Sequence, residues 1–381
     1  MELIFHEPFF FTKNIEMILT EIINYLETIA PSSLQESYDN AGLIVGNSSS
    51  TVHKALICLD STEEIVDEAI EQKADLIIAH HPIIFKGLKK LNGKNYVERV
   101  VMKAIQHNIA IYAIHTNLDN VMVGVNNKIA EKLGLRNCKI LSPKNNQLKK
   151  LVTFVPKAHA DDVRKALFDA GCGTISNYDE CSFNVEGIGT FKGNETTNPF
   201  VGERNKTHHE NEVRIETIFP LHLERKIIAA LLAAHPYEEV AYDIYLLENE
   251  HPQIGAGMVG ELSEEMAEID FLKLIKQNLK TDCIRHTALL GREVRKVAVC
   301  GGSGSFLLDQ AKQAKADFFI TADFKYHEFF DAENSLVIAD VGHYESEQFT
   351  MDLLFEILSK KYPTFALLKT KISTNPIKYF Q

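Results

Sequence analysis

The sequence has no surplus of positive charge, no closely spaced cysteine pair and no long apolar run. Its formal net charge of -12 argues against a nucleic-acid or anionic-membrane surface. No stretch approaches the roughly 18 apolar residues of a membrane span. The six cysteines are scattered without a CxxC pair, so we expect reduced thiols in a cytoplasmic protein.

The first residues, from Met1 to Lys13, contain three consecutive phenylalanines but lack the other marks of a signal peptide. There is no basic start and no small-residue cleavage site. We expect this segment to be an extension that packs on the surface or on a neighbouring chain.

A chain of 381 residues is longer than one hydrophobic core usually serves, so we expect two domains. Strands and helices alternate over residues 14–148, which indicates a doubly wound, mostly parallel α/β sheet. Residues 149–250 follow the order βαββαβ, which is that of a ferredoxin-like α+β unit. The α/β pattern resumes over residues 251–381. We therefore predict one core domain in two halves, with a ferredoxin-like domain inserted between them.

The two outer segments contain an internal repeat. Lys54 to His81 aligns without gaps on Lys296 to Asp323, with nine identities in 28 positions. The two halves of the core therefore look like diverged copies of one βαβ module, and both copies should end their strands at a common site.

Residues that can bind metals or move protons follow three predicted strands, at the point where each strand ends. They are His80 and His81, then His115 and Asp119, and finally His343 and Glu347. Open α/β sheets place their sites at the carboxyl ends of the strands. We therefore expect these side chains at one edge of one sheet. The alternative for each pair alone is a set of polar surface residues.

The chemistry of these side chains predicts a mixed nitrogen and oxygen site. Three imidazoles (His80, His81, His343) and two carboxylates (Asp119, Glu347) suffice for two ions only if one carboxylate bridges them. Such donors suit Zn, Mn, Fe or Ni better than Mg or Ca. Two ions about 3.5–4 Å apart can acidify a shared water and bind a developing oxyanion, which is hydrolytic chemistry.

Several spaced motifs, in order, resemble the Nif-three-like family of dinuclear-metal hexameric proteins, often described as GTP cyclohydrolase 1 type 2 homologues. The matching segments are Tyr38 to Leu43, Ala79 to Pro82, His115 to Asp119, Thr321 to His327 and Gly342 to Glu347. The resemblance implies two metal ions per chain on His80, His81, Asp119, His343 and Glu347, with Glu347 bridging. It also implies a homohexamer and an insert similar to P-II or CutA domains. Tyr38 and Ala322 depart from the family pattern, but neither is one of the implied ligands.

Other residues near these motifs are weaker candidates. His115 and His327 are candidate proton-transfer groups, although each can also be a structural or surface histidine. Asp323 occupies the repeat position of His81 and is a candidate for contact with substrate or for orienting a ligand. Gly302, Ser303 and Gly304 follow a predicted strand and can present N–H groups to an anion, or form a plain tight turn. In the insert, the polar run from Gly193 to Asn211 is predicted to be a loop that leaves His208 and His209 solvated.

Three functions fit these observations. The first is a metal-dependent hydrolase of a nucleotide or related small molecule; the resemblance implies GTP cyclohydrolase-type ring opening, with attack at C8 of the purine and release of formate. The second is a metal-stabilised hexameric scaffold or regulator without catalysis. The third is a metal-dependent phosphoesterase, which uses the same paired ions on a different bond.

Overall fold

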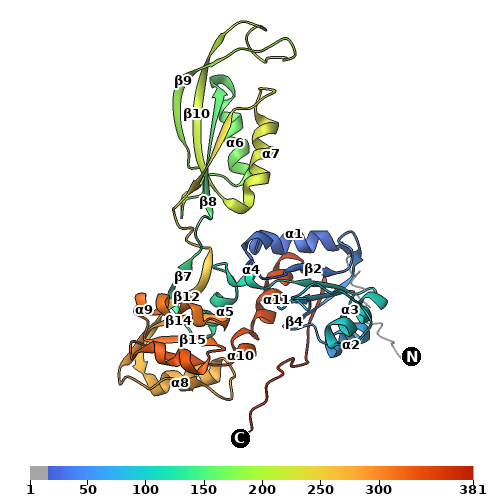
Figure 1. The fold of residues 1–381 in the computed structure, drawn as a ribbon, viewed down its shortest axis with the longest axis vertical. Helices are drawn as coiled ribbons and strands as arrows, with labels where there is room; N and C mark the ends of the chain where they lie inside the picture. Colours follow the sequence, from blue (N-terminus) through green and yellow to red (C-terminus); the bar gives the residue numbers. More distant parts are fainter. Residues whose placement is uncertain (1–15, 381) are drawn as a thin grey trace, which may run out of the picture. The chain divides into compact units, whose positions relative to one another are not determined.

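The computed structural model describes residues 16–380 and divides into two compact units (Figure 1). The first unit contains the chain up to Ser142 and from Gly255 onward, and the second unit is Pro143–Ile254. The predicted insert, residues 149–250, lies within the second unit. The expectation for Met1 to Lys13 falls outside the described residues. No described helix is long and apolar enough to cross a membrane.

One sheet of the first unit contains the strands that precede His80 and His115. Its strands, in spatial order, are β17 (Ala366–Lys369), β4 (Lys54–Cys58), β5 (Leu76–Ala79), β6 (Ala110–Ala113) and β2 (Gly42–Val45). β2 is antiparallel to β6, and the other neighbours run parallel. Every residue of β5 and β6 is buried, as expected for central strands of a sheet covered on both faces.

Several helices belong to this sheet. A short two-stranded antiparallel ribbon is formed by segments that are close to its strands in the sequence. The helices are α1 (Leu19–Ile29), α2 (Glu63–Glu71), α3 (Tyr96–Gln106), α4 (Thr116–Asp119) and α11 (Thr350–Lys361). The helix α5 (Val125–Lys132) follows α4 in the chain but packs on the second sheet of the same unit. The ribbon pairs β1 (Met17–Ile18) with β3 (Thr51–Val52). Asn95 begins α3 because its side chain accepts a hydrogen bond from the Glu98 N–H, a typical helix cap.

A second sheet of the same unit precedes His343. Its strands, in spatial order, are β13 (Arg285–His286), β16 (Val337–Asp340), β15 (Phe318–Ala322), β14 (Glu293–Ser303), β12 (Gly255–Ala267) and β7 (Arg136–Pro143). Its helices are α8 (Glu268–Asn278), α9 (Leu308–Gln313) and α10 (His343–Glu347). β14, β15 and β16 run parallel, while β13 and β12 pair antiparallel with their neighbours.

The expectation of a single core sheet was wrong, because the two halves build separate sheets. In each copy the parallel strands find partners that cap the open edges: β17 pairs with β4 in the first sheet, and β12 pairs with β14 in the second. Each sheet therefore ends in its own outer strands, β17 and β2 in the first and β13 and β7 in the second, and no described strand of one sheet pairs with a strand of the other. The mixed α/β character of the fold is confirmed.

The repeat is visible in matching local structure. Asp75 accepts hydrogen bonds from the backbone of Lys54, and Asp317 does the same for Lys296. The N–H of each aspartate also donates back to the carbonyl of the same lysine. The two copies therefore keep the same strand-to-strand connection, although few of their other residues are identical.

The second unit is a four-stranded antiparallel sheet with two helices on one face. Its elements, in chain order, are β8 (Leu148–Pro156), α6 (Ala160–Ala170), β9 (Phe183–Phe191), β10 (His208–Pro220), α7 (Glu224–Ala234) and β11 (Tyr242–Leu247). The strand order is β11-β8-β10-β9, and the chain order βαββαβ is that of a ferredoxin-like unit. Apolar residues of α6 and α7 pack on the inner face of β8 and β10.

One local expectation in this unit was wrong. β10 begins at His208, so His208 and His209 lie in a strand and not in the predicted polar loop. His208 pairs with Phe191 of β9, and its Nε2 lies 2.8 Å from a carboxylate oxygen of Glu210. The hairpin continues past the apolar part of its sequence, because backbone pairing does not require apolar side chains on an exposed edge.

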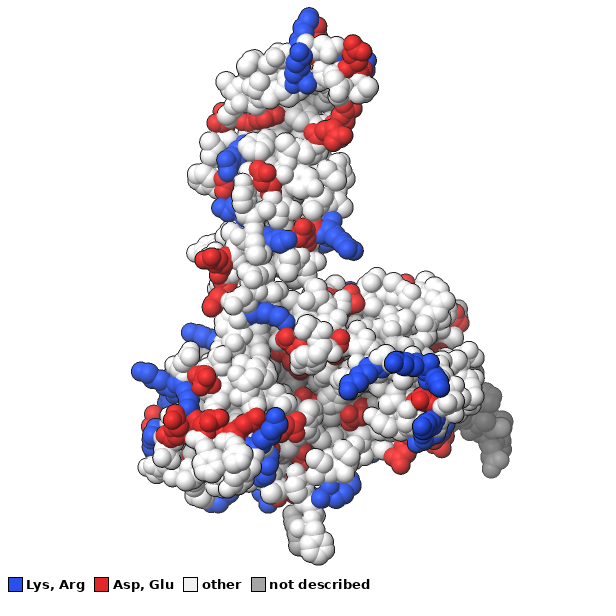
Figure 2. Space-filling model, viewed as in Figure 1, with Lys and Arg blue, Asp and Glu red and all other residues white. Residues whose placement is uncertain are grey.

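The distribution of charged side chains on the surface is consistent with the net negative charge of the chain. On the face shown in Figure 2, lysines and arginines are scattered among acidic side chains and do not form one continuous basic patch.

Candidate metal centre

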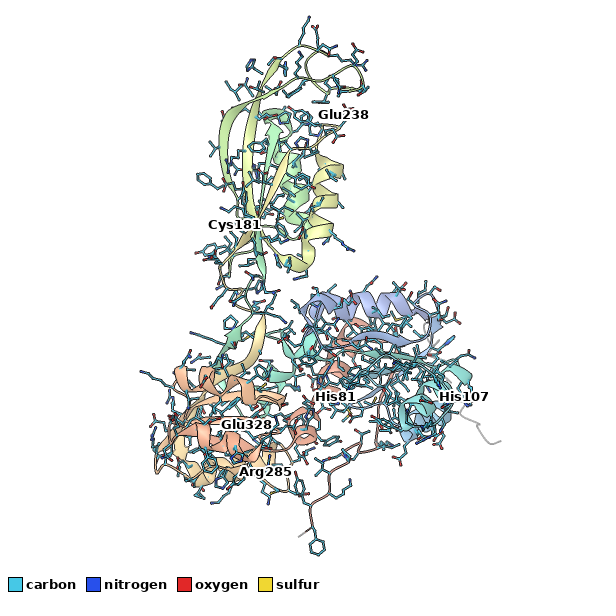
Figure 3. The ribbon with its side chains drawn as sticks, in the orientation of Figure 1. His81, His107, Cys181, Glu238, Arg285 and Glu328 are labelled. Atoms are coloured by element: carbon cyan, nitrogen blue, oxygen red, sulfur yellow. The ribbon has the colours of Figure 1, made fainter. Side chains whose placement is uncertain are left out.

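Three chain segments of the first unit bring potential ligands together. His80 and His81 directly follow β5, Asp119 is the last residue of α4 after β6, and α10 contributes His343 and Glu347. His81 lies between the part of the unit built on β4–β6 and the part that contains α10 (Figure 3). The structure therefore places all five predicted ligands in one cluster, although they come from two sheets.

Glu347 is the centre of this cluster, and its two carboxylate oxygens face different histidines. Oε1 lies 3.8 Å from Nε2 of His80, which is also 3.7 Å from Oδ1 of Asp119. Oε2 lies 2.9 Å from Nε2 of His81 and 3.1 Å from Nε2 of His343. These contacts define two overlapping groups that can hold a metal ion: His80, Asp119 and Glu347, and His81, His343 and Glu347. A third possible group is His80, His81 and His115, which does not include Glu347.

Buried atoms without partners support a metal on the first group. Nε2 of His80 and Oδ1 of Asp119 are both buried, and neither has a hydrogen-bond partner among the described residues. Orphaned buried polar atoms are costly, so two that face each other at 3.7 Å point to a missing cation between them. The donor set, imidazole nitrogen with carboxylate oxygen, fits a divalent transition metal.

Each histidine of the cluster is oriented through its other ring nitrogen. Nδ1 of His80 lies 2.8 Å from the carbonyl oxygen of Ile114. Nδ1 of His81 lies 2.7 Å from Oδ1 of Asp60, and Nδ1 of His343 lies 2.6 Å from Oδ2 of Asp323. An Nδ1–H that donates to an oxygen leaves Nε2 as the lone-pair donor, which is how metal-binding histidines are usually held.

The charges of the cluster shift its pKa values strongly. Burial, together with the nearby Glu347 carboxylate, raises the pKa of Asp119 to about 8. Burial would also raise the pKa of Glu347, but the facing histidines, His343 first, hold it well below its usual range. For His81 the effect of burial is outweighed by hydrogen bonds to Asp60 and Glu347, which raise its pKa to about 10. Several neighbouring groups with strongly shifted pKa values are typical of a functional site.

His115 lies beside the cluster but is held differently. Its ring centroid is 5.3 Å from that of His80 and 5.3 Å from that of His81. Its Nδ1 lies 2.7 Å from Oδ1 of Asp39, and Oδ2 of Asp39 accepts hydrogen bonds from Thr116. These bonds outweigh burial and lower the pKa of Asp39 to about 2. Asp39 therefore fixes the His115 ring through Nδ1.

The structure does not bring every candidate into the site. His327 is an exposed residue of the short 3-10 helix Tyr326–Ala332, and it is not among the residues that line the cavity around Glu347. Gly302 and Ser303 are the last residues of β14 and do not form a loop after it. The N–H of Gly302 already donates to Oγ of Ser346.

Gly302 has a different role from the predicted anion site. Its φ is +61°, and a Cβ at this position would lie 2.4 Å from Oε1 of Glu347. Only glycine fits both the backbone conformation and the close approach of the Glu347 carboxylate.

Of the aspartates that orient the histidines, the sequence analysis named Asp323 as a candidate, and that residue holds His343. It missed the other two. Asp60 holds His81, and its other oxygen accepts from Oγ1 of Thr374 near the C-terminus. Asp39 holds His115. Asp60 follows β4 just as the predicted ligands follow their strands, so the same reasoning about strand ends, applied to β4, would have found it.

A cavity of about 430 Å³ opens onto the cluster. Aromatic side chains of Tyr38, Phe85 and Phe306 line it, together with the amides of Asn120 and Asn126. None of the described residues that line it is a lysine or an arginine.

Comparisons with known proteins agree with this geometry. A family model described as Duf34/NIF3 (NGG1p interacting factor 3) matches residues 17–376, which is nearly the whole chain. The chain belongs to the Duf34/NIF3 family. The resemblance noted from the sequence motifs is thereby confirmed.

This Duf34/NIF3 protein is similar over most of its length to relatives and solved structures from bacteria. A GTP cyclohydrolase 1 type 2 homolog of Halalkalibacterium halodurans is 40% identical over 364 residues, which cover 94% of this chain and 98% of the relative. One of Bacillus subtilis is 38% identical over 365 residues, with the same coverage of 94% and 98%. A solved Bacillus cereus protein related to NIF3 has a TM-score of 0.83 and 41% identity, and the match covers 97% of this chain and all of that one. A Staphylococcus aureus structure has a TM-score of 0.75 and 30% identity, covering 96% and 99%.

Proposed function

We propose that this Duf34/NIF3 protein is a hydrolase of a nucleotide or related small molecule that works with two divalent metal ions per chain. The observation that carries the proposal is the position of Glu347, whose two oxygens face two separate sets of ligands. His80 and Asp119 would complete one set, and His81 and His343 the other. Zn, Fe, Mn and Ni all suit these donors.

The metal pair would supply Lewis acidity for the bond that is cleaved and would acidify the attacking water. The chain supplies the rest of the chemistry. His115 lines the cavity, and Asp39 holds its Nδ1–H, so Nε2 is the atom that accepts and returns a proton. Tyr38 and Phe85, which also line the cavity, offer flat apolar faces to a substrate ring.

The relatives' name supports ring-opening hydrolysis of a purine such as that of GTP, with loss of formate. The test is to load the purified protein with Zn, Fe, Mn or Ni and to measure formate from GTP and phosphate from simple phosphoesters. His115→Gln should lower kcat by about 10²-fold or more without loss of metal, because it removes the proton acceptor.

The outcomes separate the three functions. Formate release that His115→Gln abolishes supports the cyclohydrolase. Release of phosphate alone makes the protein a phosphoesterase. If protein that holds two ions releases neither product, the hydrolase proposal is overturned and the metal-stabilised scaffold remains. The homohexamer expected from the resemblance stays a prediction, which sedimentation of metal-loaded and chelated protein would test.

The cavity predicts a preference within the nucleotide class. Because none of the described residues that line it is a lysine or an arginine, a triphosphate would gain no side-chain cation from them. Each charge-assisted contact to phosphate would otherwise contribute about 1.5–3 kcal/mol. We therefore expect kcat/KM for guanosine to be within about tenfold of that for GTP. A preference for GTP beyond about a hundredfold would contradict this prediction.

The orienting aspartates give a prediction about metal affinity. Asp323→Asn removes the carboxylate that holds Nδ1 of His343, and Asp60→Asn does the same for His81. Each change should weaken metal binding by about 10–100-fold, because the ring loses its orientation and basicity. Competition with a chelator measures the affinity. Asp75→Asn is the matched control. Asp75 also accepts hydrogen bonds from backbone N–H groups of the same unit, but it does not belong to the cluster. An equal loss in all three variants would mean general destabilisation.

A further inference from the structure

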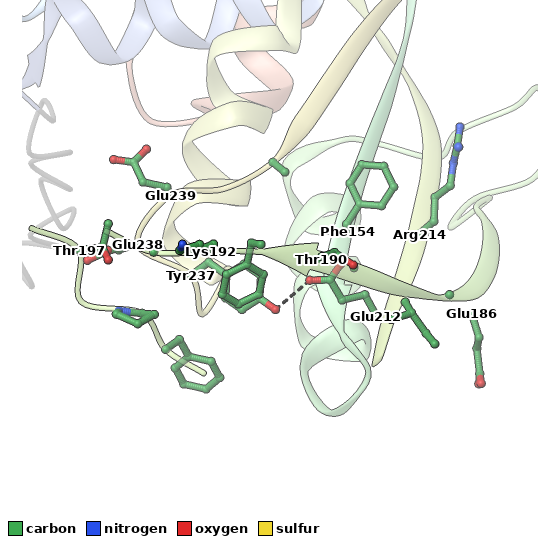
Figure 4. Close-up of a pocket in the computed structure, with 18 of the residues that line it drawn as sticks. Phe154, Glu186, Thr190, Lys192, Thr197, Glu212, Arg214, Tyr237, Glu238 and Glu239 are labelled. Atoms are coloured by element: carbon green, nitrogen blue, oxygen red, sulfur yellow. Dashed lines mark hydrogen bonds between the residues drawn. The ribbon is translucent and has the colours of Figure 1, made fainter. Parts of the chain in front are cut away.

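The second unit contains its own cavity, with a volume of about 570 Å³. Phe154, Glu212 and Arg214 line it, and they alternate along β8 and β10 with core residues such as Val155 and Val213. Side chains alternate between the two faces of a strand, so the cavity lies on the face of the sheet that α6 and α7 do not cover (Figure 4). The segment between β9 and β10 and the turn before β11 complete its walls.

Aromatic rings form much of the cavity wall. Phe154, Phe191, Phe200 and Tyr237 all line it. The ring centroids of Phe191 and Tyr237 are 5.8 Å apart, and those of Phe200 and Tyr237 are 6.3 Å apart. The faces of such rings are electronegative and attract cations.

A buried carboxylate lies within this aromatic wall. Glu212 is only 8% exposed. Its Oε1 accepts a hydrogen bond of 2.8 Å from the hydroxyl of Tyr237, as the dashed line in Figure 4 marks. Its Oε2 accepts no hydrogen bond from any described residue. A carboxylate has about four acceptor positions, so the Tyr237 hydroxyl occupies only one of them and Oε2 can accept from a ligand.

The surroundings of Glu212 keep it in this position. Burial and the neighbouring Glu212 raise the pKa of Tyr237, which keeps the phenol protonated and donating. Gly189 of β9 makes room for the carboxylate, since a Cβ there would lie 2.0 Å from Oε2 of Glu212. The position of Oε2 is therefore fixed, although no lysine or arginine in the described part of the chain pairs with Glu212.

The remaining charged residues that line the cavity do not neutralise Glu212. Arg214 pairs with Glu216 at 2.9 Å, and its guanidinium lies 5.9 Å from the centroid of the Phe154 ring. The other carboxylates of the lining are Glu186, Glu238 and Glu239, and the other cation is Lys192. Carboxylates therefore outnumber cations four to two in the lining.

We propose that this cavity binds an organic cation that has N–H donors on an apolar body, such as an alkylammonium or an amidinium compound. The N–H groups would donate to Oε2 of Glu212, and the apolar body would lie against Phe154 and Tyr237. This site is separate from the metal centre and does not depend on the proposed hydrolase.

Benzamidine and its neutral counterpart benzamide form a matched pair of probes for the full-length protein. They share the ring, but only benzamidine is a cation. We expect calorimetry or ligand-observed NMR to give a benzamidine Kd of about 1 mM or tighter, and binding of benzamide at least about tenfold weaker. Glu212→Gln should weaken the binding of benzamidine at least about tenfold, because the substitution removes the charge of the side chain and keeps its shape. Gly189→Ala should have the same effect by displacing the carboxylate.

Glu224→Gln is the control, because Glu224 is a carboxylate of the same unit that pairs with Lys149 and does not line the cavity. It should leave benzamidine binding unchanged. The proposal is overturned if benzamidine does not bind up to about 10 mM, if benzamide binds equally well, or if Glu212→Gln binds benzamidine as tightly as the unaltered protein.

Discussion

Replacement of Glu347 by alanine is expected to empty both halves of the metal centre at once. Both of its oxygens face ligand nitrogens, Oε1 at 3.8 Å from His80 and Oε2 at 2.9 Å from His81. No other described carboxylate occurs in both ligand groups. The metal content of the metal-loaded protein, measured by elemental analysis, should therefore fall from about two ions per chain to nearly none.

Two further variants separate a bridge from an ordinary ligand. Asp119→Ala should reduce the content to about one ion per chain, because it removes a ligand from the His80 group alone. His343→Ala should likewise remove only the ion of the other group. If Glu347→Ala retains one ion, the carboxylate serves a single metal and the dinuclear proposal fails.

The same substitution should alter stability in a way that identifies its cause. In the metal-free protein Glu347 compensates the charged forms of His81 and His343, whose pKa values it raises. Loss of one partner of a buried charge network costs about 3–5 kcal/mol. The melting temperature of metal-free Glu347→Ala should therefore fall below that of the metal-free parent. Addition of metal should raise the melting temperature of the parent but not that of the variant.

The strand ends made the ligands predictable from the sequence. Apolar strands such as Leu76–Ala79 and Ala110–Ala113 are recognisable by composition, and each is followed at once by residues that bind metals. In a parallel sheet those ends must meet at one edge. That argument covers His80, His81 and Asp119, which follow strands of one sheet. His343 follows a strand of the second sheet, so its approach to the other ligands depends on how the two sheets pack against each other.

What could not be predicted depends on contacts between distant segments. The Thr374 hydroxyl reaches Asp60, which in turn holds His81, and nothing in the local sequence of either segment encodes that pairing. Strand pairing at the edges of the sheets could not be predicted either, because the strand that pairs with β4 is determined by the packing of the whole unit. The need for glycine at position 302 follows from the approach of Glu347, and that approach is visible only in three dimensions.

Metal binding should release protons, and metal affinity should therefore rise steeply with pH. In the metal-free protein, burial would lower the pKa of His343, but Glu347 and Asp323 outweigh it and raise the pKa to about 11. The pKa of His81 is about 10, and burial raises that of Asp119 to about 8. All three groups hold protons at neutral pH, and all three must lose them to become ligands.

The direction in which metal affinity changes with pH follows directly from these raised pKa values. Below the lowest of them, each pH unit gained should strengthen binding of both ions together by up to about 10³-fold, one factor of ten for each proton released. Calorimetry at pH 7 in two buffers of different ionisation enthalpy counts the protons, and chelator competition at pH 6, 7 and 8 gives the slope. Asp323→Asn should lower the count, because it removes one cause of the raised pKa of His343. Binding that is independent of both buffer and pH would mean that the three ligands are already deprotonated, and that the charges around Glu347 are balanced in some other way.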